Sequence, residues 1–192
     1  MNGDKILIFN NNFPNFFNIF TIYNKIVEIF VPDVSIAENT KLRGKINADQ
    51  GKFELDFSSP NILAFDGKFD NIKIDIDNKN LLYNTYVVMD SLRFNRYKIS
   101  DFNLINLTLN DTLFVRTEFN GGSKNEDQFS LNLYHTIDNE KNSIVGFKKS
   151  EVKLRDYLWF INEKETRDNK IIFTKDLKDF KFEKISLSHK DQ

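Results

Sequence analysis

The side chains with the clearest metal-binding chemistry are those of Asp75-x-Asp77-Asn78. Carboxylates at alternate positions open the calcium-binding loop of EF-hand proteins. That loop also needs a glycine at its sixth position and a closing glutamate, and neither is present here. Because both aspartates lie in a segment that alternates with isoleucine, the pattern favours a solvated strand face over a metal site.

Two histidines and one tryptophan are the remaining candidates for chemistry. His135 and His189 each fall where an alternating apolar pattern expects an apolar residue, and the spacing assigns neither of them an acid–base partner. Trp159 could stack on a ligand, although a packed position is the favoured interpretation. The sequence has no phosphate loop, nucleophile elbow or paired carboxylates, so we expect no enzymatic activity, no metal and no cofactor.

Composition excludes several classes of protein. The 192 residues carry 27 Lys and Arg against 28 Asp and Glu, a net charge of −1 that argues against a nucleic-acid partner. The absence of cysteine excludes disulfide scaffolds and thiolate zinc sites. A hydrophobic content of 40% is too high for a disordered chain.

The first segment, residues 1–32, has the pattern of a helix. Apolar side chains at Phe16, Phe20, Tyr23, Val27 and Phe30 follow spacings of three and four, which predicts an amphipathic helix over residues 16–30. Prolines stand at its two ends, at positions 14 and 32. We expect this helix to pack on a neighbouring sheet.

From residue 33 to 192 the apolar period becomes two, which predicts many short strands with one apolar and one polar face. The fold expected is all-β: an elongated, curled, antiparallel-rich sheet, or open solenoid groove. We predict that the inward positions line one shared apolar trough. These are Phe53, Leu55, Phe57, Ile72, Ile74, Ile76, Ile105, Leu107, Leu109, Phe129, Leu131, Leu133, Ile185 and Leu187.

A weak repeat supports that arrangement. The pattern Phe-x-x-Ile-x-apolar-x-apolar begins at Phe69 and again at Phe102, and it returns at Phe182, where His189 occupies the last apolar position. Repeats of this kind indicate strands that stack along an axis, each burying its apolar face only against its neighbours. The period leaves open whether this face is a filled core or an open trough.

Longer phrases of the sequence resemble the TamB family (translocation and assembly module) as it occurs in Bacteroidetes, within the AsmA-like, bridge-like lipid transfer superfamily. The resemblance extends over about residues 31–189. It is carried by VPDVSIAENTKLRG (31–44), FELDFSSP (53–60), IDNKNLLYNTY (76–86), YKISDFNLIN (97–106), DTLFVRTEFNGG (111–122), NLYHTI (132–137) and DYLWFIN (156–162).

The resemblance implies that this chain is an internal segment of a longer envelope protein. Such a protein has an inner-membrane anchor outside these residues, crosses the periplasm and works with a TamA-like outer-membrane barrel. Its apolar β-groove would hold phospholipid acyl chains on their way between the two membranes, in support of outer-membrane biogenesis. The alternative is a structural or interaction β-solenoid that assists outer-membrane protein assembly by pairing its open edges with client strands.

Overall fold

The computed structural model describes residues 16–19, 33–47, 49–78 and 84–189. The first strands are β1 (Phe16–Ile19), β2 (Val34–Ile36), β3 (Lys41–Asn47), β4 (Lys52–Ala64) and β5 (Gly67–Asp77). The central strands are β6 (Asn84–Phe94), β7 (Tyr97–Leu109), β8 (Thr112–Gly121), β9 (Asp127–Ile137) and β10 (Ser143–Phe147). The last are β11 (Ser150–Leu154), β12 (Tyr157–Ile161), β13 (Lys170–Phe173), β14 (Phe180–Glu183) and β15 (Leu187–His189).

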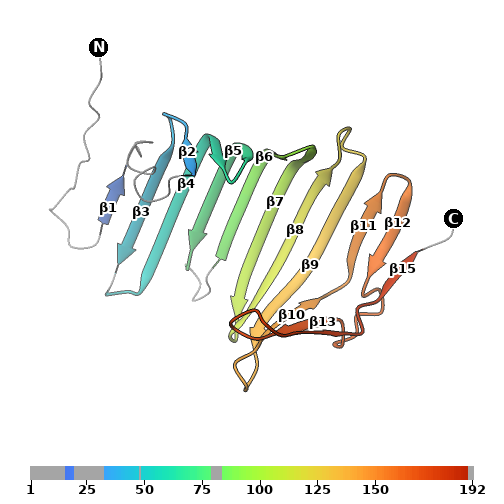
Figure 1. Cartoon of the computed structure of the whole chain (residues 1–192). Coiled ribbons are helices and arrows are strands. Elements are labelled where there is room, and N and C mark those ends of the chain that lie inside the picture. Colours follow the sequence, from blue (N-terminus) through green and yellow to red (C-terminus); the bar gives the residue numbers. More distant parts are fainter. Residues whose placement is uncertain (1–15, 20–32, 48, 79–83, 190–192) are drawn as a thin grey trace, which may run out of the picture.

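All fifteen strands belong to one antiparallel sheet that does not close into a barrel, so the predicted all-β class is confirmed (Figure 1). Neighbours in sequence are neighbours in the sheet from β3 to β10, after which the order continues through β13 to β14. Local pairing of this kind follows from short turns, which bring each strand back beside the one before it.

The predicted helix falls mainly outside the described residues, at positions 20–30. Its first four residues are described, and there the prediction is wrong, because Phe16–Ile19 forms β1 and pairs with β3. A short apolar run fits either period, and the hydrogen-bonding edge of β3 selects the extended form here. Among the described residues there is no helix, so none that could span a membrane.

Two-residue turns join β4 to β5, β6 to β7 and β7 to β8, and each of them contains at least one left-handed residue. Both turn residues between β4 and β5, Phe65 and Asp66, have positive φ, as do Asn110 and Asp111 between β7 and β8. Turns with two left-handed residues match the twist of the strands that they join. Asparagine and aspartate tolerate this conformation best among non-glycine residues, which explains how a chain with few glycines makes so many hairpins.

The sheet is a single layer over the described residues. Every substantial contact between strands joins hydrogen-bonded neighbours, and no second layer packs across them. The only apolar side chains that are buried are those of Ile36, Ala64, Met89 and Phe160, within the part of the chain that is described. Most of the apolar residues of the long strands are half-buried instead, by their neighbours in the same sheet.

The sheet forks at β9, because two strands share that one long neighbour. The first half of β9 pairs with β11, and the second half pairs with β10. One branch then continues through β12 to β15, and the other through β13 to β14. In Figure 1 the β10–β13 branch crosses the direction of the long strands at their lower ends.

A buried polar cluster joins the two branches of the fork. The Asn162 side chain donates to the Phe147 carbonyl of β10 (2.6 Å) and accepts from the Asn169 amide (3.0 Å). Asn169 in turn accepts from the Ser186 backbone N–H (2.7 Å), just before β15. Because both asparagines are 2% exposed, these bonds are shielded from water and hold the branches at a defined position.

Candidate functional site

The two faces of the sheet differ in chemistry, and the register assigns residues to them. Directly opposed residues of antiparallel strands share a face. Ile74 opposes Val87, which opposes Leu104, and further along Thr117 opposes Leu131. We call the face that carries these residues the apolar face. The opposite one, the polar face, carries Lys73, Asp75 and their neighbours in register.

The register divides the fourteen predicted lining residues between these faces. Ten lie on the apolar face: Phe53, Leu55, Phe57, Ile72, Ile74, Ile76, Phe129, Leu131, Leu133 and Leu187. Three lie on the polar face: Ile105, Leu107 and Leu109. Ile185 belongs to neither, since it lies between β14 and β15. The prediction of one shared face is therefore wrong for these four, while lipid contact stays a prediction for all of them.

The physical reason for the error is the register of β7. Ile105 opposes Tyr86 and Arg116, and its neighbour Leu104 opposes Val87 and Thr117. Leu104 and Ile105 are both apolar, so alternation alone does not show whether the even-numbered or the odd-numbered residues of β7 share a face with Ile74. The set missed from the sequence is Phe102 and Leu104, together with Val87 on β6 and Val115 on β8.

The two copies of the repeat do not lie on the sheet in the same way: Phe69 and Ile72 share the apolar face, whereas Phe102 lies on the apolar face and Ile105 on the polar face. Phe69 and Ile72 are an odd number of residues apart, as are Ile99 and Phe102, yet a left-handed residue stands between the members of each pair, Asn71 (φ 52°) and Asp101 (φ 54°). Such a residue interrupts the alternation. Both members of each pair therefore lie on the apolar face.

The side chains around Gly121 confirm this placement of the upper strand ends. A Cβ built on Gly121 would meet the Tyr97 hydroxyl and the Phe129 ring, so Tyr97 and Phe129 lie on the same side of the sheet. Phe129 opposes Phe119 in β8, and Tyr97 shares its parity with Ile99 in β7. The apolar face thus continues past the interruption at Asp101 to the upper edge.

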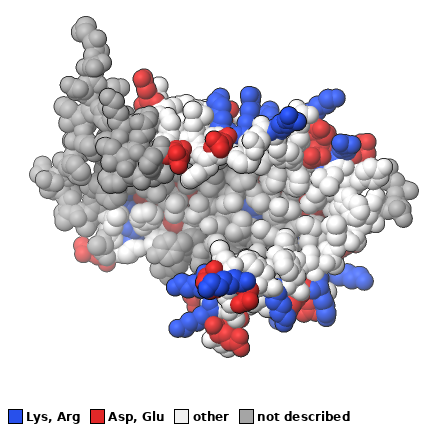
Figure 2. All heavy atoms as spheres, viewed as in Figure 1, with Lys and Arg blue, Asp and Glu red and all other residues white. Residues whose placement is uncertain are grey.

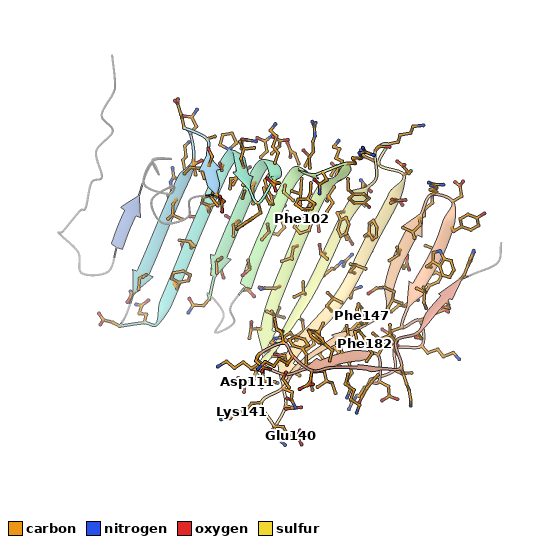
Figure 3. All side chains as sticks on the ribbon, viewed as in Figure 1. Phe102, Asp111, Glu140, Lys141, Phe147 and Phe182 are labelled. Atoms are coloured by element: carbon orange, nitrogen blue, oxygen red, sulfur yellow. The ribbon has the colours of Figure 1, made fainter. Side chains whose placement is uncertain are left out.

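Aromatic rings form a row across the apolar face. Phe119 stacks on Phe129 with ring centroids 4.5 Å apart, and Phe102 lies 6.0 Å from Phe119. The row continues in register through Val152 to Trp159 and His189. Figure 3 shows Phe102 near the upper ends of the long strands, and Phe147 and Phe182 on the lower branch.

Charged side chains avoid the apolar face. The view in Figure 2 shows them gathered along the upper and lower margins of the molecule, with a mainly uncharged band between. Ion pairs on the polar face include Lys45–Glu54 (3.5 Å) and Arg116–Glu118. In the described residues of β3–β9, the register assigns one carboxylate to the apolar face, that of Asp127, which opposes Gly121.

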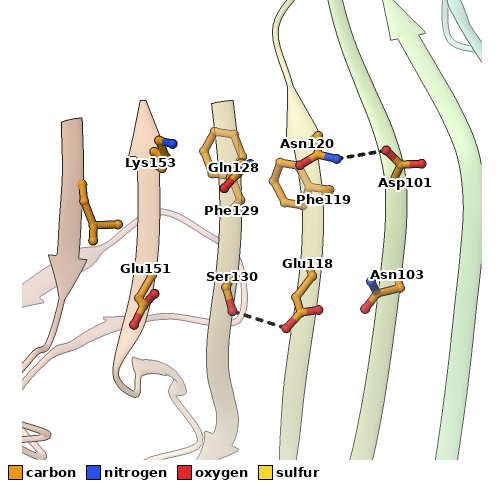
Figure 4. A pocket seen from close by; sticks show the side chains of 11 residues that line it. Asp101, Asn103, Glu118, Phe119, Asn120, Gln128, Phe129, Ser130, Glu151 and Lys153 are labelled. Carbon is orange, nitrogen blue, oxygen red and sulfur yellow. Dashed lines mark hydrogen bonds between the residues drawn. The ribbon is translucent and has the colours of Figure 1, made fainter. Parts of the chain in front are cut away.

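The polar face has a hollow of about 540 Å³ over β7, β8, β9 and β11 (Figure 4). Three carboxylates line it, those of Asp101, Glu118 and Glu151. Glu118 and Glu151 lie two strands apart, since Glu118 opposes Ser130 and Ser130 opposes Glu151. A hydrogen bond from Arg116 holds the pKa of Glu118 below its ordinary value. A carboxylate that stays ionised at neutral pH is poorly suited to donate a proton.

The other candidates from the sequence lie apart from one another. Asp75 and Asp77 lie on the polar face, where Asp75 opposes Asp56 and Asp77 opposes Glu54. No group of three potential metal-ligating side chains occurs in the part of the chain that is described. His135 lies on the apolar face of β9, and His189 contacts Trp159 (ring centroids 4.8 Å apart) at the far end of the same face.

These features define a class of protein: an open, single-layer antiparallel sheet with one apolar and one polar face, forked at one end. No protein-family model, curated protein or solved structure matches the chain.

Proposed function

We propose that this chain is a segment of a TamB-like envelope protein whose apolar sheet face holds phospholipid acyl chains as they pass between inner and outer membrane. The observation that supports it is the half-exposed apolar face of a single-layer sheet, to which no described element is docked. Each CH₂ group transferred from water to an apolar surface gains about 0.8 kcal/mol, so such a face favours acyl chains strongly.

The dimensions of the face suit this cargo. Six gaps separate β3 from β9, and strands are about 4.8 Å apart, so the face extends roughly 29 Å across the strands. That length is about the thickness of the hydrocarbon core of a bilayer. A sheet of this kind, curled into a groove and continued by further segments, would shield acyl chains over a long path. The periplasmic location and the TamA-like partner belong to the same proposal and rest on the sequence resemblance alone.

Native mass spectrometry of the purified chain tests the proposal. We expect phospholipid to remain bound after purification from cells, because removal of two acyl chains from the apolar face costs far more than thermal energy. The control is the same chain delipidated in detergent and re-exposed to phospholipid vesicles, which should recover the bound mass. A chain that neither retains nor recovers phospholipid would contradict the proposed function.

A second candidate function is strand pairing with client proteins or with further copies of the sheet. The observation that favours it is the pair of open edges at the fork, since β14 pairs only with β13, and β15 only with β12, in the described residues. Unpaired N–H and C=O groups at such edges are templates for strand addition.

Self-association of the chain is the measurable consequence of these edges. We expect sedimentation velocity to show dimers or larger species whose proportion rises with protein concentration. The test variant is Phe182→Pro, because it places a residue without an N–H in β14, at the open edge. A proline at Ile172 would not test the edge, because β13 is paired on both sides. Phe182→Pro should reduce association, and a monomer at all concentrations in the unmodified chain would count against the second function.

A further inference from the structure

A cavity of about 550 Å³ opens on the apolar face where β9, β11, β12 and β15 meet. Its lining combines aromatic, apolar and charged side chains: Asp127, Leu154, Arg155, Tyr157, Trp159 and His189. Strand register brings them together, because Leu154 opposes Tyr157, and Trp159 opposes both Val152 and His189. A volume of this size suits a small molecule or the polar head of a larger one.

Three aromatic side chains form one wall of this cavity. The His189 ring lies 4.8 Å from Trp159 and 5.6 Å from Tyr157, centroid to centroid, and it meets Tyr157 edge-on. Aromatic faces arranged in this way attract cations such as ammonium groups through their ring quadrupoles. The His189 Nδ1 atom is buried without a hydrogen-bond partner among the described residues.

Charges of both signs face the same cavity. Asp127 accepts hydrogen bonds from the Arg155 backbone N–H (3.1 Å) and from the Tyr97 hydroxyl (3.5 Å), which leaves acceptor capacity on its carboxylate. Burial, and then the charge of Asp127, raises the pKa of Tyr97. Within the described residues, no carboxylate lies within ion-pair distance of the Arg155 guanidinium, so this group is available to an anion.

We infer that this cavity binds the headgroup of a zwitterionic phospholipid, with the ammonium against Asp127 and the aromatic wall and the phosphate on Arg155. The acyl chains would then lie along the aromatic row that begins next to the cavity, at Phe129 and Phe119. This inference rests on the proposed function and deepens it, because it names the headgroup class that the apolar face presents at its rim.

Other headgroup charges fit the lining less well. A purely anionic headgroup would bring a second negative charge close to Asp127. Among the described residues of β3–β9, this is the one carboxylate that the register assigns to the apolar face. A purely cationic ligand would leave Arg155 unpaired beside it. An ammonium and a phosphate joined by a short linker satisfy both groups at once.

Trp159 makes a direct test possible, since it is the single tryptophan of the chain and lines the cavity. Dihexanoylphosphatidylethanolamine, kept below its micelle concentration, is titrated into the full chain while tryptophan emission is recorded. We expect a saturable change, with affinity about tenfold higher than for dihexanoylphosphatidylglycerol, which has the phosphate without the ammonium. Equal affinity for the two lipids would overturn the inference.

Free phosphoethanolamine distinguishes the two sources of this headgroup. It has the same charges and no acyl chains, so we expect it to change the emission only at much higher concentration than the lipid. If it binds as tightly as the lipid, the ligand is a soluble phosphate ester and the inference of a lipid headgroup is wrong.

Two substitutions test which side chain binds the ammonium and which binds the phosphate. Asp127→Asn keeps an oxygen that accepts from the Arg155 N–H, and it should reduce the preference for phosphatidylethanolamine over phosphatidylglycerol to about one. Arg155→Gln should weaken both lipids about equally. The matched controls are Asp156→Asn and Arg96→Gln, exposed turn residues that do not line the cavity and should bind like the unmodified chain. An unchanged preference in Asp127→Asn would overturn the ammonium site.

The experiments distinguish a failure of the headgroup site from a failure of the proposed lipid-binding function. Phospholipid retained in native mass spectrometry, without any headgroup preference at Trp159, would leave the apolar face as a lipid surface and remove only the headgroup site. Loss of all lipid binding, including acyl-chain capture, would remove both.

Discussion

Leu104→Glu is expected to reduce the phospholipid retained by the chain about tenfold or more, whereas Ile105→Glu is expected to leave it unchanged. These adjacent residues of β7 are both aliphatic, yet the register places Leu104 on the apolar face and Ile105, 51% exposed, on the polar face. A carboxylate on the apolar face must either lose water or hold the acyl chain away from the sheet, and both outcomes cost several kcal/mol of lipid binding.

The measurement is the phospholipid mass retained in native mass spectrometry, with urea denaturation of each variant beside it. Both variants should remain folded, because Leu104 is only half-buried and a carboxylate there keeps part of its hydration. Lipid loss in both variants alike would remove the distinction between the faces. Unfolding of Leu104→Glu alone would show that the apolar face is packed as a core, and the open trough would then be wrong.

Asn162→Ala is expected to destabilise the chain more than any other single asparagine substitution in the described sheet, by about 3 kcal/mol or more. Its amide donates to the Phe147 and Thr166 carbonyls, and its oxygen accepts from Thr166 and Asn169. Removal of that side chain leaves several buried polar groups without partners. Alanine must also adopt the left-handed conformation at this position, where φ is 49°.

Thermal unfolding measures the effect, and for a chain of this size we expect Tm to fall by roughly 6–12 °C. The control is Asn95→Ala in the exposed turn between β6 and β7, which has the same left-handed backbone (φ 53°) and makes no side-chain hydrogen bond in the part of the chain described. It should cost about 1 kcal/mol, the strain alone. Similar losses in the two variants would show that the buried bonds at the fork add nothing.

The strand content and the turns were predictable from local sequence. Alternation in Phe53–Phe57 and Ile72–Ile76 predicts strands with one apolar face, and both are observed as parts of β4 and β5. The pair Asn110-Asp111 predicts a turn and forms one. Such features depend on residues within a few positions of one another, so a single sequence contains the information needed for them.

The helix prediction shows where a local pattern was insufficient. Apolar spacing over residues 16–30 fits a helix, yet Phe16–Ile19 is extended because β3 offers unpaired hydrogen-bonding groups beside it. A short segment takes the conformation that its tertiary neighbours favour, and those neighbours do not appear in its own pattern.

By itself, the sequence determined that the chain forms amphipathic strands joined by asparagine-rich turns. Only the tertiary structure decided which side of each strand belongs to the apolar face, as at Leu104 and Ile105, and where the sheet forks. It alone brought Asp127 to the same cavity as Trp159 and His189. The physical reason is that alternation sets parity within one strand, whereas the relation between strands depends on pairing register and on single left-handed residues such as Asp101.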